Sequence, residues 1–251
     1  MKFIKPLFST SFLMLLLCSC NSTKRNTLTI ATAANMQFAM KTLAEAYTAE
    51  TGQQVELVVS SSGKLTAQIR EGAPYDLFFS ADTKYPQAIY ETGGGTSTPV
   101  TYASGQLVLW STSKNLQVSI DQLTNDEVKH IAIANPRTAP YGTAAVEVLK
   151  QLELFDAVKD KLVYGESISQ VNQFIISQAA EIGFTAKSVV LSPNMSGQSN
   201  WIAIADSLHA PINQAMVVLK NDRGLEKEAE AFAAFVGSEK GLSILRSFGY
   251  K

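Results

Sequence analysis

The chain contains few of the residues on which metal centres and covalent catalysts depend. Its 251 residues include two cysteines and two histidines, and His130 and His209 lie far apart in the sequence. Zinc and related metals need several such ligands at short spacing, so we expect no direct protein-to-metal ligands. With two histidines and two cysteines, few Ser–His or Cys–His pairs are possible for a nucleophile, and the sequence holds no G-x-S-x-G turn. We therefore expect no catalytic residue and no cofactor.

The chain also lacks an excess of charge of either sign. Lysine and arginine number 21 and aspartate and glutamate 22, which gives a formal net charge of −1. This balance supplies no basic field for a phosphate backbone and argues against nucleic acid as a partner. With 46% hydrophobic and 17% charged residues, the composition is that of a globular protein and excludes general disorder.

Long hydrophobic runs are absent except for one near the N-terminus. Lys2 and Lys5 precede an apolar run from Leu7 to Leu17, which is too short to span a bilayer comfortably. A basic start followed by a short apolar run is typical of a signal peptide. We expect residues 1–19 to be that signal and the protein to leave the cytoplasm for the periplasm.

The end of this run indicates a lipid anchor. The string Leu17-Cys18-Ser19-Cys20 is similar to the cleavage box of bacterial lipoproteins, in which a small residue precedes the cysteine that is lipidated. Cys20 fits that place better than Cys18, because bulky Leu17 precedes Cys18. An ordinary secretory signal cleaved near Ser19 is the alternative. Residues 20–26, polar and without periodicity, are predicted to form a tether.

After the tether, strand and helix patterns alternate along the chain. Such alternation predicts an α/β protein with parallel sheets covered on both faces, and about nine strands are better divided between two sheets than placed in one. The expected strands are 28–34, 55–60, 76–82, 105–111, 130–136, 161–165, 181–186, 201–206 and 215–219. The expected helices are 36–50, 64–70, 85–90, 141–152, 169–178, 226–236 and 239–248.

Three places share one shape, in which small or polar residues separate a strand from a helix. They are Ala34-Asn35, the segment 60–64 with Ser62 and Gly63, and the segment 135–142. Ligands in such folds lie beyond the carboxyl ends of strands, where helix N-termini present free N–H groups to an anion. Each place also has a structural interpretation: Asn35 can cap the next helix, and 135–142 can be a rigid connector.

The charged residues near these turns leave two interpretations open. Lys64 and Arg137 can pair with an anion or be solvated at the surface. The segment ending in Lys64 superficially imitates a P-loop, but Val58 stands where that motif needs glycine and Leu65 where it needs serine or threonine. Glu166 is the one acidic residue near the predicted turns, and a helix-start role is preferred for it.

Several strings, taken together and in order, resemble one protein family. They are ATAANMQFAM, SSSGKLTAQIREGAPYDLFFSAD, ANPRTAPYGTAAVEVLKQL, GESISQVNQFI and AEIGFTA, and the resemblance runs from about Thr29 to Tyr250. In this the chain is similar to the periplasmic molybdate-binding proteins of ABC importers. The resemblance implies a two-lobed, monomeric, non-enzymatic binding protein that holds molybdate or tungstate in its cleft and delivers it to an ABC permease in the inner membrane.

The same resemblance implies a set of ligand contacts. When the family's ligand contacts are transferred to the matching positions of this sequence, Asn35 and Ser62 are implied to bind the oxyanion from the first lobe. The backbone N–H groups of Tyr141 and Ile168 are implied to bind it from the second, with Ala34 and Gly63 flanking. Molybdenum is then held as its oxyanion, without protein-to-metal bonds. Another branch of the family uses a tyrosine hydroxyl where this chain has Ala186, so that contact is missing here.

The order of elements also predicts the lobes and how they move. Residues 27–104 and 214–251 are expected to form lobe one and residues 105–213 lobe two, so that the chain crosses twice between them and closes by hinge bending. A binding protein for another small anion, such as sulfate or an organic acid, is the main alternative. A hydrolase that uses Ser62 as nucleophile is a weaker one, because neither histidine can be placed beside it.

Overall fold

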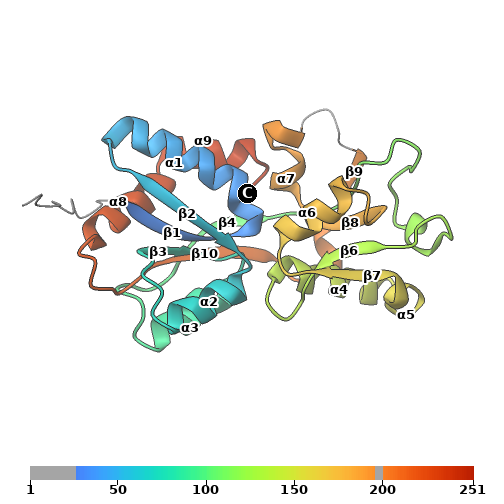
Figure 1. Ribbon diagram of the computed structural model, residues 1–251, viewed down its shortest axis with the longest axis horizontal. Helices are drawn as coiled ribbons and strands as arrows, with labels where there is room; N and C mark the ends of the chain where they lie inside the picture. The colour runs from blue at the N-terminus through green and yellow to red at the C-terminus, as the bar shows by residue number, and fades with distance from the viewer. Residues whose placement is uncertain (1–26, 196–199) are drawn as a thin grey trace, which may run out of the picture.

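Two five-stranded sheets, each flanked by helices, lie side by side in the computed structural model (Figure 1). The structure describes residues 27–195 and 200–251, so the expected signal peptide, the tether and Cys20 lie outside the described residues. We call each sheet with its helices a lobe. The two-lobed α/β architecture predicted from the sequence is confirmed.

The sheet of lobe one has the strand order β2-β1-β3-β10-β4. Its strands are β1 (Leu28–Ala33), β2 (Val55–Ser60), β3 (Leu77–Phe79), β4 (Val100–Gly105) and β10 (Ile212–Val218). Strand β1 pairs in parallel with β2 and β3, whereas β10 runs antiparallel to both β3 and β4. Successive residues of β3 enter different apolar clusters, Leu77 and Phe79 on one face and Phe78 on the other. The sheet is therefore buried on both faces, as its apolar strands require.

The sheet of lobe two has the order β7-β6-β8-β5-β9. Its strands are β5 (Leu107–Ser111), β6 (Ile131–Ala134), β7 (Leu162–Gly165), β8 (Ile182–Ala186) and β9 (Asn200–Ala203). Strand β6 is parallel to β7 and β8, and β5 is antiparallel to β8 and β9. One continuous apolar cluster fills this lobe and extends to Ala33, Ala34 and Ala81 of lobe one. The core is therefore continuous across the junction of the lobes.

The helices lie in layers over the two sheets. In lobe one, α1, α8 and α9 cover one face and α2 and α3 the other (Figure 1). The helices are α1 (Gln37–Thr51), α2 (Ser62–Arg70), α3 (Lys84–Glu91), α4 (Pro140–Gln151), α5 (Phe155–Val158), α6 (Ile168–Ile176), α7 (Lys187–Val190), α8 (Glu226–Val236) and α9 (Glu239–Ser247). Short 3₁₀ turns are η1 (Ala34–Met36), η2 (Asp121–Thr124), η3 (Lys159–Lys161), η4 (Pro193–Met195) and η5 (Asp206–Leu208).

Two details of the sheets differ from the sequence prediction. Strand β4 is absent from the predicted strands; it is largely half-exposed or exposed and lies at the edge of the sheet. Such an edge strand lacks the apolar run by which buried strands are recognised. The expectation of parallel sheets was also wrong, since both sheets are mixed. Strands β5 and β10, which follow crossings between the lobes, run against their neighbours.

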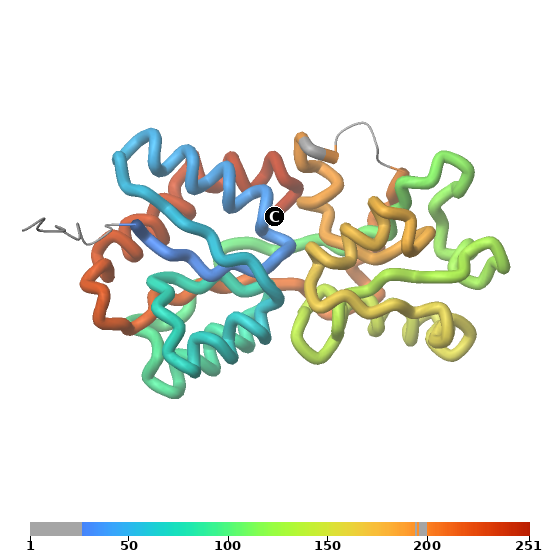
Figure 2. Tube along the Cα trace, viewed as in Figure 1, coloured from blue at the N-terminus to red at the C-terminus, as the bar shows by residue number. Residues whose placement is uncertain are grey.

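The chain passes between the lobes twice. The first passage joins β4 to β5 and the second joins β9 to β10, and both can be followed along the trace in Figure 2. Gly105 ends β4 at the first passage, where an added Cβ would lie 2.1 Å from Tyr141 Oη. Glycine is therefore required there for a lobe-two side chain to pack against the crossing strand.

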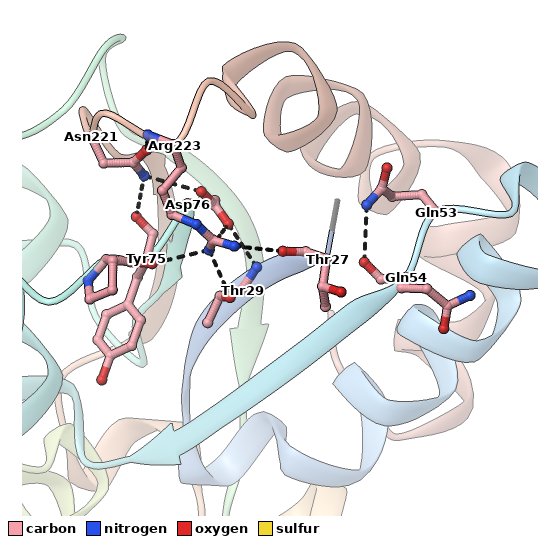
Figure 3. Close-up of polar contacts among 9 residues, drawn as sticks. Thr27, Thr29, Gln53, Gln54, Tyr75, Asp76, Asn221 and Arg223 are labelled. Carbon is pink, nitrogen blue, oxygen red and sulfur yellow. Dashed lines mark hydrogen bonds and ion pairs between the residues drawn. The ribbon is translucent and has the colours of Figure 1, made fainter. Parts of the chain in front are cut away.

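A buried ion pair joins the start of β1, the start of β3 and the segment after β10 (Figure 3). Asp76 accepts hydrogen bonds from the Thr29 backbone N–H at 2.7 Å, from Arg223 Nη1 at 2.6 Å and from Asn221 Nδ2 at 3.1 Å. Arg223 also donates to the Thr27 carbonyl at 2.8 Å. The Asp76 side chain is 1% exposed, and its lone pairs are satisfied as a buried carboxylate requires. Asp76, the first aspartate of the GAPYDLFFSAD string, thus has a structural role, away from the junction of the lobes.

Candidate functional site

A small cavity, with a volume of about 10 Å³ open to the centre of a water-sized sphere, lies where the two lobes meet. Its lining comes from the ends of strands and the starts of helices in both lobes. The lining residues are Ala33, Ala34, Asn35, Ser61, Ser62, Ala81, Ala139, Pro140, Tyr141 and Ile168. The predicted contacts Asn35, Ser62, Tyr141 and Ile168, with Ala34 beside them, are thus brought together on one surface that carries no charged side chain. Gly63 lies immediately behind it.

The cavity is surrounded by the beginnings of four helical segments. The turn η1 leads into α1, and helices α2, α4 and α6 begin at Ser62, Pro140 and Ile168. The first N–H groups of a helix have no acceptor within it, and the helix dipole places partial positive charge at the same end. Pro140 occupies the first position of α4, where a missing N–H costs nothing. The arrangement therefore presents several N–H donors to an anion without a positively charged side chain.

Ser62 is prepared to donate its hydroxyl into this cavity. It is 1% exposed, and its Oγ accepts a hydrogen bond from the Ala81 backbone N–H at 3.0 Å. One lone pair is thus occupied and the orientation of the hydroxyl is restricted, while its own hydrogen has no acceptor among the described residues. The SAD string that contains Ala81 and the SSSGK string that contains Ser62 are thus joined by this bond.

The Asn35 side chain is engaged with the protein. Its Nδ2 donates to Gln214 Oε1 at 2.9 Å and to Tyr250 Oη at 3.0 Å, so both amide hydrogens have acceptors. The carbonyl of Asn35 accepts from Ser188 Oγ at 2.7 Å. The alternative that Asn35 caps the following helix finds no support, since η1 and α1 have no side-chain cap bond. The Asn35 side chain therefore ties the turn η1 to β10 and to the C-terminal Tyr250.

These bonds belong to a buried polar network beside the cavity. Gln214, on crossing strand β10, accepts from Tyr102 Oη at 3.0 Å and donates to Tyr141 Oη at 3.4 Å. Tyr250 Oη donates to the Asn35 carbonyl and contacts Ser188 Oγ, both at 3.1 Å. Both lobes contribute, because Tyr141 and Ser188 belong to lobe two. The network therefore connects the cavity lining with the crossings of the chain.

Burial keeps the phenols of this network neutral. Desolvation raises the pKa of Tyr102 and Tyr141 well above 10 and that of Tyr250 to about 12, although the hydrogen bonds that Tyr250 makes with Ser188 and Asn35 oppose part of the rise. All three phenols therefore remain hydrogen-bond donors at neutral pH, and no buried phenolate faces the cavity.

The lobes are in direct contact around the cavity. The Gly63 N–H donates to the Thr138 carbonyl at 2.9 Å, and Ser169 Oγ donates to Gln37 Oε1 at 2.7 Å. A Cβ on Gly63 would lie 2.9 Å from the Thr138 Cα and 2.7 Å from the Tyr85 hydroxyl. Glycine at this position therefore permits the observed approach of lobe one to lobe two.

The charged residues near the predicted turns are occupied elsewhere. Lys64 Nζ lies 2.5 Å from Glu166 Oε2, an ion pair between lobe one and lobe two. Arg137 is exposed and belongs to a neighbouring groove, together with Asp82 and Glu147. Burial raises the pKa of the Asp82 carboxyl. Neither Lys64 nor Arg137 lines the cavity, so the interpretation in which they bind an anion directly finds no support.

Other features predicted from the sequence can also be placed. Ala186 is buried at the end of β8 and does not line the cavity. Over residues 27–195 and 200–251, no three His, Cys, Asp or Glu side chains gather into a potential metal site. In the same part of the chain no helix combines the length and apolarity needed to cross a bilayer.

Sequence reasoning missed the supporting residues Gln214, Ser188 and Tyr250. They lie 179, 153 and 215 positions from Asn35. Ser188 follows the first crossing between the lobes, and Gln214 and Tyr250 follow the second. No local pattern marks them. A signal did exist for Ser61, which stands directly before Ser62 at a strand-to-helix turn and lines the same cavity.

An uncharged cavity between two α/β lobes, ringed by helix N-termini, defines the class of extracytoplasmic binding proteins for small anions. The family model described as bacterial extracellular solute-binding protein matches residues 28–251, and the chain belongs to this family. The expected membership of a solute-binding family is thereby confirmed.

Particular relatives are similar over nearly the whole chain. The molybdate-binding protein ModA of Azotobacter vinelandii is 37% identical over 227 residues, covering 88% of each chain. The Bacillus subtilis protein YvgL, assigned as a substrate-binding lipoprotein of an ABC transporter, is 30% identical and covers 96% of this chain and 94% of its own. The solved periplasmic molybdate-binding protein of Azotobacter vinelandii superposes with a TM-score of 0.84 at 33% identity, over 89% of this chain and 98% of that one.

Proposed function

We propose that this protein captures molybdate or tungstate in the cavity between its lobes and delivers it to an ABC permease. One observation carries the proposal: helix N-termini and the Ser62 hydroxyl surround a cavity that no charged side chain lines. A tetrahedral dianion offers acceptor oxygens on all sides, and neutral donors fixed around it can replace its water. The family and the molybdate-binding relatives support this assignment. The protein acts as a transport component and not as an enzyme.

The proposed contacts are four donors from two lobes. Ser62 donates its hydroxyl, and Asn35, Tyr141 and Ile168 donate backbone N–H groups, with Ala34 and Gly63 flanking them. No protein atom binds the molybdenum itself. Because a protonated phosphate needs an acceptor and the cavity lining offers no carboxylate, phosphate is disfavoured. Sulfate is smaller, and a tightly built cavity leaves some donors out of its reach.

The two lobes proposed are residues 27–104 with 214–251 and residues 105–213, closing by rotation about the two crossings. The polar contacts from Gly63 to Thr138 and from Ser169 to Gln37 support a closed arrangement of these lobes. A single chain supplies every proposed contact, so we propose a monomer. Light scattering of the mature protein with and without molybdate should give one chain per particle in both cases.

Thermal unfolding with a panel of anions tests the proposed ligand. A ligand that binds only the folded state stabilises it by about 4 kcal/mol at a thousandfold excess over Kd, which for this chain length corresponds to a shift on the order of 10 °C. We expect such shifts of Tm with molybdate and tungstate and almost none with sulfate, phosphate or nitrate. An equal response to sulfate would reduce the function to general oxyanion binding. No response in protein freed of bound ligand would remove the oxyanion function.

We also propose that the exported protein is anchored through a lipid on Cys20. The signal pattern before Cys20 supports this, as does the lipoprotein assignment of the relative YvgL. Cys20→Ser should move the protein from the membrane to the soluble periplasmic fraction. An intact mass that shows an unmodified mature N-terminus would refute the anchor and leave the binding proposal untouched.

A further inference from the structure

Ser61 occupies a position where serine normally caps a helix, yet it makes no cap. It lies between β2 and α2 in an extended conformation, with φ −72° and ψ 149°. At such a position the hydroxyl ordinarily accepts an N–H of the first helical turn. Here no cap bond from the Ser61 side chain is formed. Helix α2 therefore begins without the stabilisation that its own sequence offers.

The hydroxyl of Ser61 is also buried without a partner. The residue is 3% exposed, and its Oγ has no hydrogen-bond partner among the described residues. Buried polar groups in folded proteins almost always have partners, so an unpaired one calls for an explanation. An N-cap bond to the first turn of α2 would give the Ser61 hydroxyl a partner, yet this bond is not formed. Ser61 therefore differs from a buried serine that has no polar group nearby.

The position of Ser61 supplies the explanation. It lines the same cavity as Ser62 and the first turns of α4 and α6. The side-chain oxygens of Thr32 and Thr138 are likewise buried and unpartnered, but neither residue lines the cavity. Of these three hydroxyls, Ser61 alone is placed to meet a ligand there.

We infer that Ser61 donates a hydrogen bond to the bound oxyanion and contributes to the choice of anion by size. The inference rests on the proposed function, since it takes the cavity to be the oxyanion site. Ser61 and Ser62 then place two hydroxyls side by side at the N-terminus of α2. Because Ala81 restrains only Ser62, the two play different parts. Ser62 gives a fixed contact, and Ser61 reaches an anion large enough to fill the cavity.

Calorimetric titration of the mature, ligand-free protein tests this with four variants. Ser61→Ala should weaken molybdate binding by about ten- to hundredfold, the loss expected for a hydrogen bond to a charged acceptor, and should leave the weak response to sulfate unchanged. Its ligand-free Tm should stay equal or rise, because an unpaired buried hydroxyl is removed. Thr32→Val removes a comparable hydroxyl outside the cavity and should not alter affinity. Ser62→Ala is the positive control, and Gly237→Ala monitors general damage from substitution.

The outcomes of these titrations distinguish a failure of the Ser61 role from a failure of the proposed oxyanion-binding function. Wild-type affinity in Ser61→Ala together with weakened binding in Ser62→Ala would overturn the role of Ser61 and leave the function standing. A ligand-free Tm lowered by several degrees in Ser61→Ala would show a capping role and also overturn it. If the wild type bound neither molybdate nor tungstate, the proposed function would fail and the inference with it.

Discussion

A single hydrogen bond decides how Ser62 can act. Its oxygen accepts the Ala81 N–H, so the hydroxyl hydrogen is the part left for a ligand. An anion needs such a donor, and a hydroxyl that had already donated to the protein would present a lone pair and repel it. The direction of this one bond leaves Ser62 a hydrogen to donate toward the cavity.

Asn35→Ala should affect stability as well as binding. The substitution removes two buried hydrogen bonds, to Gln214 and Tyr250, at a cost of about 1–3 kcal/mol. For a chain of this size the ligand-free Tm should fall by roughly 2–12 °C. Molybdate affinity should fall less than in Ser62→Ala, because the backbone N–H of residue 35 remains. Differential scanning calorimetry and titration calorimetry measure the two effects, and an unchanged ligand-free Tm would contradict the supporting role of the side chain.

The residues of the cavity could be predicted from the sequence to the extent that local pattern defines them. Asn35 and Ser62 follow strands and precede helices, and such turns meet at the strand ends of an α/β fold. The role of the Asn35 side chain could not be predicted, since its partners Gln214 and Tyr250 are more than 170 positions away. Local pattern identifies which residue lines the cavity, whereas distant partners determine how its side chain is held.

At the scale of elements, α2 closely approaches the turn before α4. Gly63 and Thr138 meet there through their backbones. Strand β4, which the sequence did not predict, matters for the same approach, because it ends at Gly105 where the Tyr141 ring packs. Edge strands have weak sequence signals, so the strand that leads into the first crossing could not be predicted from local pattern.

Gly63→Ala should hinder closure without unfolding either lobe. Its Cβ would lie 2.9 Å from a backbone atom of Thr138, and backbone cannot move aside as a flexible side chain can. An overpacking cost of about 1–3 kcal/mol borne by the closed form alone corresponds to roughly 5- to 150-fold weaker binding. Stopped-flow measurements should show faster molybdate release. Gly237→Ala is the matched control, since its Cβ meets nothing nearer than 3.6 Å, and equal release rates in the two variants would refute the steric explanation.

At the scale of the whole molecule, the buried phenols should make the fold sensitive to alkali. The folded-state pKa of Tyr250 is about 12 against an ordinary value of 10, so the unfolded chain ionises first as pH rises. The stability from the neutral phenol is complete below pH 10 and is lost as pH rises toward 12. Tyr102 and Tyr141 act in the same direction.

Urea unfolding midpoints measured from pH 8 to pH 12 test this. Tyr250→Phe should be less stable than the wild type at pH 8, because its hydrogen bonds are lost, and should then decline less steeply above pH 10. Tyr164→Phe, at an exposed position, should follow the wild-type curve. Parallel curves for wild type and Tyr250→Phe would mean that this phenol titrates alike in the folded and unfolded chain.

The position of β10 has a consequence for the order in which the molecule assembles. It lies between β3 and β4, yet it is synthesised only after all of lobe two. As the chain emerges from a membrane pore, strands β5 to β9 can pair with one another, while the edge of β3 that β10 later covers remains unpaired. Open strand edges invite pairing with foreign chains, and pairings distant in sequence form slowly. We therefore expect lobe two to form first and lobe one to be completed only when β10 pairs with β3 and β4. Pulse-labelled hydrogen exchange during refolding should record protection in β6 and β8 before β3.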